Sequence, residues 1–139
     1  MPYCTAHSIH FGRIGRQHIE ANFKGGSISS DGGVLLLRQL DKHLGLSAAV
    51  AGALHDPRNP KQTTHSMRSL IAQRLYGLCC GYEDLNDHNQ LRHDPLLQTA
   101  VGSSQKLASS PTFSRMETRI TRQELWALNA VLVDQFIAS

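Results

Sequence analysis

The sequence of 139 residues lacks long apolar runs, a secretory leader and spaced cysteines, and each absence excludes a class of protein. Apolar runs such as residues 34–37 are far shorter than the roughly 20 residues that a membrane-spanning helix needs. No apolar stretch follows a basic one at the N-terminus, which excludes an ordinary signal peptide. The three cysteines include the adjacent pair Cys79 and Cys80, which excludes a disulfide framework. We therefore expect a cytoplasmic protein without a membrane partner.

Common nucleotide-binding and hydrolase motifs are absent as well. The sequence contains no P-loop, no glycine fingerprint for dinucleotides and no nucleophile elbow. Its eight histidines are scattered, and no pair has the spacing of a zinc-ligand set. Charged residues amount to 18% and hydrophobic residues to 40%, so the chain is no disordered tail and has the composition of one folded domain.

Arginine is the abundant basic residue. The formal net charge is +3, and the 14 basic residues comprise ten arginines and four lysines. Because arginine is suited to bidentate phosphate contacts, this composition favours a nucleic-acid partner, although an exposed basic face without a partner is the alternative. The candidates for DNA contact are Arg115, Arg119, Arg122 and Lys106, followed by Arg68 and Arg74. Arg115 and Arg119 lie one helical turn apart, so we expect both to contact phosphates of one DNA strand.

Hydropathy periodicity predicts a mainly α-helical fold with a small β element at the N-terminus. Residues 18–24 alternate like a half-buried strand, which we expect to pair with residues 7–11 through a turn at Gly12–Gly15. Helices are expected over residues 32–44, 46–54, 65–80, 83–92 and 95–101, and from Ser110 onward. Thr121 and Glu124 have the spacing of a capping box, which predicts the start of a last helix.

Two of these helices carry more specific expectations. The apolar stripe of the 32–44 helix includes Leu36 and Leu40, which are therefore expected in the core. The 65–80 helix is expected to be capped by Thr63 or Thr64. Gln73 is expected to lie away from the apolar face of that helix.

The last helix is expected to be apolar on more than one side. Over residues 125–137, one stripe consists of Leu125, Leu128, Leu132 and Phe136, and a second of Trp126, Ala130, Val133 and Ile137. A helix that is apolar over so wide an arc needs partners on two sides. Either it lies in the middle of its own domain, or it packs against another domain or a second copy of the chain.

Residues 81–95 are rich in carboxylates and imidazoles. If they form one helix, Asp84 and His88 share a face at i, i+4, an arrangement that can hold a divalent metal or perform acid–base chemistry. Alternatively, the acidic groups stabilise a helix N-terminus and their neighbours form ordinary hydrogen bonds. The turn at Asp31, Gly32 and Gly33 also has two interpretations, an anion-binding turn or a simple helix cap.

Three segments, in this order and spacing, resemble a known family. They are SSDGGVLLLRQLDKHLGL (29–46), HDPRNPKQTTHSMRSLIAQRLYGLCCGYEDLNDHNQLRHDP (55–95) and LASSPTFSRMETR (107–119). The set resembles the N-terminal region of insertion-sequence transposases of the IS1380 family, which have a DDE catalytic core. The similarity covers residues 20–125. The motif residues, which we expect to be mainly structural, are Asp31, Gly32, Gly33, Gly81, Tyr82, Asp84, Asp87, His88, Arg92 and Asp94.

The resemblance implies cut-and-paste DNA transposition. Members of that family bind double-stranded DNA at the terminal repeats of their element. They cleave and rejoin it in a ribonuclease-H-like α/β core with three carboxylates and two divalent ions, normally Mg²⁺. By this resemblance Asp31, Asp56, Asp84, Asp87 and Asp94 do not fall at family catalytic positions, so we assign no catalytic residue, metal ligand or cofactor to the chain. Mg²⁺ is expected for the full-length parent enzyme.

We expect the chain to be an N-terminal part of such a transposase, inactive in DNA cleavage by itself. The expected divisions are a β element at residues 1–26, a helical module at 27–120 and a helix at 121–139 leading into a missing catalytic core. That core, or self-association through residues 125–137, is the expected partner of the last helix. Two alternatives remain open: a non-enzymatic DNA-binding regulator, and a metal-dependent phosphohydrolase using the polar residues at 83–94.

Overall fold

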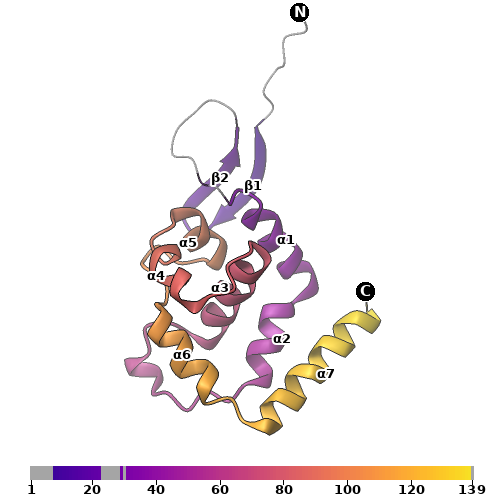
Figure 1. Ribbon diagram of the computed structural model, residues 1–139. Coiled ribbons are helices and arrows are strands. Elements are labelled where there is room, and N and C mark those ends of the chain that lie inside the picture. Colours follow the sequence, from indigo (N-terminus) through magenta and orange to yellow (C-terminus); the bar gives the residue numbers. More distant parts are fainter. Residues whose placement is uncertain (1–7, 23–28, 30, 139) are drawn as a thin grey trace, which may run out of the picture.

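A computed structural model describes residues 8–22, 29 and 31–138 (Figure 1). Within these residues the fold is mainly helical, with one small antiparallel sheet. The strands are β1 (Ile9–Ile14) and β2 (Gln17–Ala21); the α-helices are α1 (Val34–Leu44), α2 (Leu46–Ala53), α3 (Met67–Cys79), α4 (His88–Leu91), α5 (Pro95–Val101), α6 (Ser110–Thr118) and α7 (Arg122–Ala138). Two 3₁₀ turns, η1 (Pro60–Gln62) and η2 (Leu85–Asp87), complete the order. None of the described helices combines the length and apolarity that crossing a membrane requires.

The predicted hairpin is confirmed, but its turn is shorter than the expected Gly12–Gly15, because β1 continues to Ile14 and Gly12 pairs with Ile19 inside the sheet. A tight turn with Gly15 at φ +60° joins β1 to β2, and a bulge between His10 and Gly12 interrupts the register. Ile19 of β2 is 9% exposed and enters the core, so the hairpin packs on the helices through one face. The strand ends at Ala21, and the remaining positions expected to extend it, residues 7, 23 and 24, lie outside the described residues.

Helix α3 lies between two apolar clusters and contributes side chains to both. The first cluster, next to the hairpin, consists of Ile19, Val34, Leu35, Ala72, Tyr76, Leu91, Leu97, Ala100 and Leu107. The second, beneath α2 and α6, consists of Val50, Leu54, Met67, Leu70, Ile71, Ala108, Phe113 and Met116. The fold is therefore arranged around α3 (Figure 1). Helix α3 contacts α1 and α5, which contribute to the first cluster, and α2, which contributes to the second.

The predicted core face of α1 was wrong for two of its four leucines, since Leu37 packs against the first cluster and Leu44 is half-buried. Val34 and Leu35 are buried, whereas Leu36 is 60% exposed and Leu40 is 53% exposed. Four consecutive apolar residues at 34–37 give no indication of which pair faces inward, and packing against α3 and α5 decides it. The expected cap of α3 was also wrong: the side chain of Ser66 caps the helix, accepting from Ser69 N–H at 3.1 Å.

Residues 83–92 do not form the single helix that the sequence suggested. The Asp84 carboxylate accepts from Asn86 N–H at 2.9 Å and caps the 3₁₀ turn η2, after which the short helix α4 begins at His88. Asp84 therefore precedes the helix, and the side chain of His88 is fully buried. The two residues do not share a helical face, which removes the basis for a phosphohydrolase site on them.

Gln73 is a buried polar residue, against the expectation from its helix position. It is 1% exposed, and its amide donates to Ala108 C=O and accepts from Ala108 N–H, both at 2.9 Å. Its nitrogen also lies 3.2 Å from Nδ1 of His88, whose ring is 4.3 Å from that of Phe113. Gly77 makes room for this imidazole, because a Cβ there would lie 3.1 Å from the His88 ring. The motif histidine therefore has a structural role.

The buried His88 predicts a specific loss of stability in acid. Burial, together with the charge of Arg74, lowers the pKa of His88 from 6.5 to about 4. The unfolded chain therefore takes up this proton at higher pH than the folded chain does, so stability is lost as the pH falls from 6.5 towards 4. From this group alone, the free energy of unfolding should fall by about 2 kcal/mol between pH 8 and pH 5.

Urea unfolding at the two pH values measures this difference. His88→Asn, which keeps a polar atom near the position of Nδ1, should lose most of the pH dependence, whereas the exposed control His43→Asn should retain it. Burial also lowers the pKa of His65, which adds a contribution of the same sign in every variant. Equal pH dependence in His88→Asn and the wild type would contradict the assignment.

Candidate nucleic-acid interface

A polar groove crosses the N-terminal end of α3. On one side is a cavity of about 330 Å³ lined by Arg38, Asp41, Lys42 and Arg68; on the other is a cavity of about 500 Å³ lined by Asp56, Arg58 and His65. The two cavities share the lining residues Ser66, Ser69 and Ser103, so we treat them as one feature, the α3 groove. Many of its lining residues lie within residues 55–69, part of the segment that carries the family resemblance.

The first cavity is lined by cationic side chains, and the neighbouring carboxylate, Asp41, already accepts hydrogen bonds from other residues. Asp41 accepts hydrogen bonds from the N–H and hydroxyl of Ser47 at 2.7 and 2.6 Å, and from the Tyr76 hydroxyl at 2.8 Å. Burial raises the pKa of Asp41, but the hydrogen bonds from Ser47 and Tyr76 and the charge of Arg68 outweigh it and lower the pKa. Lys42 and Arg68 are exposed and form no ion pair with a described residue, so both can meet an external anion.

The second cavity is built on an internal ion pair. Arg58 donates to both oxygens of Asp56, at 2.7 and 2.6 Å, and this bonding lowers the pKa of Asp56 to about 2. The guanidinium of Arg119 lies 3.5 Å from the same carboxylate. Two arginines therefore share one aspartate, and the local charge stays positive. The arrangement also ties the loop after α2 to the end of α6.

The start of α3 adds to this positive potential. A helix N-terminus presents unpaired backbone N–H groups and the positive end of the helix dipole, which together favour anions. In the groove this end lies beside Arg68 and the hydroxyls of Ser66 and Ser69. The combination of helix terminus, guanidinium and hydroxyls matches the groups that proteins use to hold phosphate.

The structure separates the predicted DNA-contact residues into available and engaged side chains. Arg68 lies in the groove, but Arg74 pairs with Glu117 at 3.0 Å. Arg119 is the residue after α6 and turns towards Asp56, so it does not form an unengaged row with Arg115. Like Arg68, the predicted residues Arg115, Arg122 and Lys106 are exposed and form no ion pair with a described residue, so they stay candidates. The groove residues Arg38 and Lys42 were missed, because α1 and α3 meet only in the fold.

The other motif residues mainly hold loops in place. The Tyr82 hydroxyl donates to Asp31 at 2.9 Å, and Asp94 caps α5 by accepting from Leu96 and Leu97 N–H at 2.8 Å each. The backbone carbonyl of Asp31 accepts from Val34 N–H across Gly32 and Gly33, and Gly81 has φ +93° after α3. Arg92 accepts through its backbone carbonyl from Leu107 N–H. Asp87 lies at the end of η2, and its charge acts weakly on His88.

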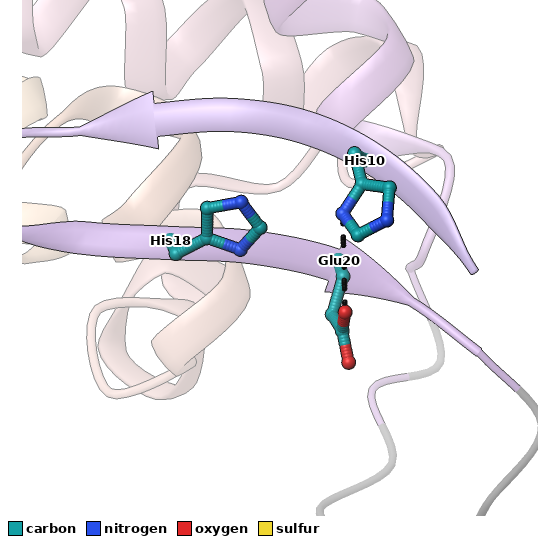
Figure 2. A group of neighbouring side chains, drawn as sticks. All are labelled: His10, His18 and Glu20. Atoms are coloured by element: carbon teal, nitrogen blue, oxygen red, sulfur yellow. Dashed lines mark ion pairs between the residues drawn. The ribbon is translucent and has the colours of Figure 1, made fainter.

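The described carboxylates do not form the three-carboxylate site that a pair of Mg²⁺ ions would need. Asp41, Asp56, Asp84 and Asp94 are each engaged by hydrogen bonds of the fold, from separate elements. In the described part of the chain, a grouping of three potential metal ligands occurs on the hairpin instead, at His10, His18 and Glu20 (Figure 2). Sequence spacing missed it because the ligands come from two strands; the alternation of His18 and Glu20 on one strand face was the available signal.

Comparison with protein families gives one clear result. The family model described as transposase DDE domain group 1 matches residues 11–139. This chain therefore belongs to the DDE transposase family. No curated protein and no solved structure matches the chain.

Proposed function

We propose that this transposase-derived chain binds double-stranded DNA, with the α3 groove holding the phosphate backbone. The observation that carries the proposal is the convergence of Arg38, Lys42 and Arg68 on the N-terminus of α3. The resemblance to the IS1380 family supports a more specific substrate, the terminal repeats of an insertion sequence. The contacts expected in the groove are with phosphate, which positions a protein on DNA but does not by itself read sequence.

Electrostatics favours the α3 groove over the residues around α6 as the surface that binds DNA phosphate. In the groove, cations from two helices and a helix N-terminus act on one cavity, and the Asp41 charge is held by three hydrogen bonds. Near α6, Arg119 is drawn to Asp56, which leaves Arg115 and Arg122 without that reinforcement. Arg38 donates to Ala100 C=O, which fixes its guanidinium at the cavity wall.

Lys42→Ala/Arg68→Ala should weaken duplex binding by on the order of 10- to 100-fold at 0.1 M salt and reduce the salt slope by about 2. Fluorescence anisotropy over a range of salt concentrations measures both quantities, with element-end and scrambled duplexes. Both duplexes should lose affinity by similar factors, because the lost contacts are with phosphates. Both side chains are exposed, so the fold should be unaffected, as circular dichroism can verify.

The matched variant is Arg115→Ala/Arg122→Ala, which also removes two exposed positive charges. We expect it to change affinity and salt slope less than the groove variant. If it causes the larger loss, the DNA lies along α6 and α7 and the groove assignment is wrong. Binding without Mg²⁺-dependent cleavage would match a DNA-binding regulator; cleavage by this chain alone would overturn the expectation that it is inactive.

We further propose that the outward side of α7 is the contact surface for the ribonuclease-H-like core that the family resemblance implies. Leu128 and Val131 pack inward on the second cluster, whereas Trp126 is 65% exposed and Ile137 is 75% exposed. Helix α7 lies at the edge of the helical bundle, beside α2 (Figure 1). When no core covers it, the same surface is available to a second copy of the chain. Mg²⁺ chemistry would belong to that core.

A further inference from the structure

The outer face of the hairpin brings together two imidazoles and a carboxylate (Figure 2). His10 of β1 lies opposite Glu20 of β2, and their side chains approach to 3.9 Å between Nδ1 and Oε2. The ring of His18 stands edge-on to that of His10, with 5.4 Å between centroids. One potential ligand atom from each residue lies within 4.8 Å of the other two. All three residues are exposed, so solvent ions have direct access.

We propose that His10, His18 and Glu20 bind one divalent transition-metal ion of the Zn²⁺ class. Zinc takes imidazole nitrogen and carboxylate oxygen at about 2.0–2.2 Å, which places ligand atoms about 3.3 Å apart around a tetrahedral ion. Small rotations of exposed side chains close the present separation to that distance. Water completes the coordination. Two imidazoles suit Zn²⁺, Ni²⁺ or Cu²⁺, whereas Mg²⁺ prefers six oxygens, so this site is separate from the family's Mg²⁺ chemistry.

The backbone explains why three ligands from a short hairpin meet. Ile19 points into the first cluster, so its neighbours His18 and Glu20 necessarily point outward on the same face. The bulge between His10 and Gly12, with Gly12 at φ +81°, bends β1 and increases its local twist. This brings His10 within reach of His18 as well as of Glu20 directly opposite. The ligands are thus placed by core packing and by the bulge, and the ion would link the two strands.

The positive charge of a neighbouring residue, Arg13, opposes cation binding and provides a further test of the site. Arg13 lies opposite His18 in the register, on the same outer face of the hairpin. Its positive charge repels a divalent cation, so removing it should strengthen binding. A metal site at this position therefore predicts that binding weakens when an imidazole is removed and strengthens when Arg13 is removed, whereas nonspecific attraction responds only to the change in charge.

The test is a titration of the untagged full chain with Co²⁺, followed by visible absorption, and with Zn²⁺, followed by calorimetry, both in millimolar Mg²⁺. We expect one equivalent to bind. His10→Ala and His18→Ala should each weaken binding at least about tenfold, and Glu20→Gln should weaken it to a similar or smaller extent. Arg13→Ala should strengthen it. The exposed controls His43→Ala and His93→Ala should leave it unchanged.

A second measurement guards against a trivial loss of fold. Circular dichroism of the metal-free variants should match the wild type, because the substituted side chains are exposed. Zn²⁺ should raise the Tm of the wild type but not that of His10→Ala/His18→Ala. Equal affinity in that double variant and in the wild type would overturn the proposal, because the ion would then bind elsewhere. Absence of binding by the folded wild-type chain would overturn it as well.

Discussion

Gln73→Leu should destabilise the chain by about 3–5 kcal/mol, because buried backbone groups lose their partners. Leucine has nearly the volume of glutamine but cannot bond to Ala108 N–H and C=O, both of which now pair with the amide at 2.9 Å. Nδ1 of His88 loses its neighbour as well. Each unsatisfied buried group costs about 1–3 kcal/mol, against a total stability of 5–15 kcal/mol for a typical domain. Thermal unfolding should show the Tm falling by roughly 10–20 °C.

Gln39→Leu is the matched control. Gln39 is exposed on α1, so this substitution makes the same chemical change at the surface. Its Tm should stay within a few degrees of the wild type. A loss of less than about 1 kcal/mol in Gln73→Leu would show that Ala108 finds other partners, and that Gln73 does not hold α3 to the segment before α6. Urea unfolding of both variants gives the difference directly.

The elements of this fold that the sequence predicts well are those with a local signal. The Thr121–Glu124 capping box is confirmed, with Thr121 N–H and Oγ1 each 2.7 Å from Glu124 Oε2 and Glu124 N–H 3.3 Å from Thr121 Oγ1. Pro95 and Pro111 lie at helix starts and Gly45, with φ +68°, at a helix end; proline and glycine at these positions are likewise local signals of helix boundaries.

Where tertiary partners decide, the sequence is insufficient. Gln73 has the sequence position of a surface residue. Its burial is favourable only because its amide forms hydrogen bonds with the backbone of Ala108, 35 positions later in the chain. Residues 83–92 are polar enough for one exposed helix, but the segment forms a 3₁₀ turn and a short helix, and His88 is buried against Phe113. A single helical period carries no information about such distant contacts.

The candidate site shows the same division. The abundance of arginine predicts a phosphate-binding surface, and one of the arginines expected there, Arg68, lines the α3 groove. Which arginines remain available depends on ion pairs between distant elements, such as Arg74 with Glu117 and Arg119 with Asp56. Composition therefore suggests only a class of partner, whereas the fold determines which arginines are available to it.

Hydrogen bonds fix the start of helix α7 to the rest of the fold, whereas its outward side is apolar and exposed. Besides the capping box, Glu124 accepts from His55 N–H at 2.8 Å, and the bonds from Thr121 and His55 lower its pKa to about 2. Six large apolar side chains on the helix are between 48% and 83% exposed: Leu125, Trp126, Leu132, Val133, Phe136 and Ile137. The alternative that α7 lies in the middle of its own domain is wrong, since none of its residues is buried.

This surface is large enough to drive association. At roughly 200 Å² for a fully exposed large apolar side chain, the six leave about 750 Å² in contact with water. That exceeds the largest apolar patch of a typical monomer, about 300–600 Å², and approaches the roughly 800 Å² that each partner contributes to a stable interface. On a helical projection all six lie within one arc of about 140°, with Val131 on the opposite side of the helix and Leu128 at the border of the arc, so a single partner can cover the six together.

Trp126→Glu/Ile137→Glu should therefore convert a self-associating chain into a monomer, the largest change in solution behaviour that we expect for this protein. The wild type should sediment as a dimer or larger species and bind an apolar dye, and the variant should lose both properties without losing stability, because the substituted side chains are 65% and 75% exposed. Gln39→Glu/Gln123→Glu adds the same charge at exposed positions outside the six-residue surface and should sediment as the wild type does. A wild-type chain that is monomeric and binds no dye would show that this surface is compatible with water, and the proposal that α7 docks onto a second folded unit would then fail.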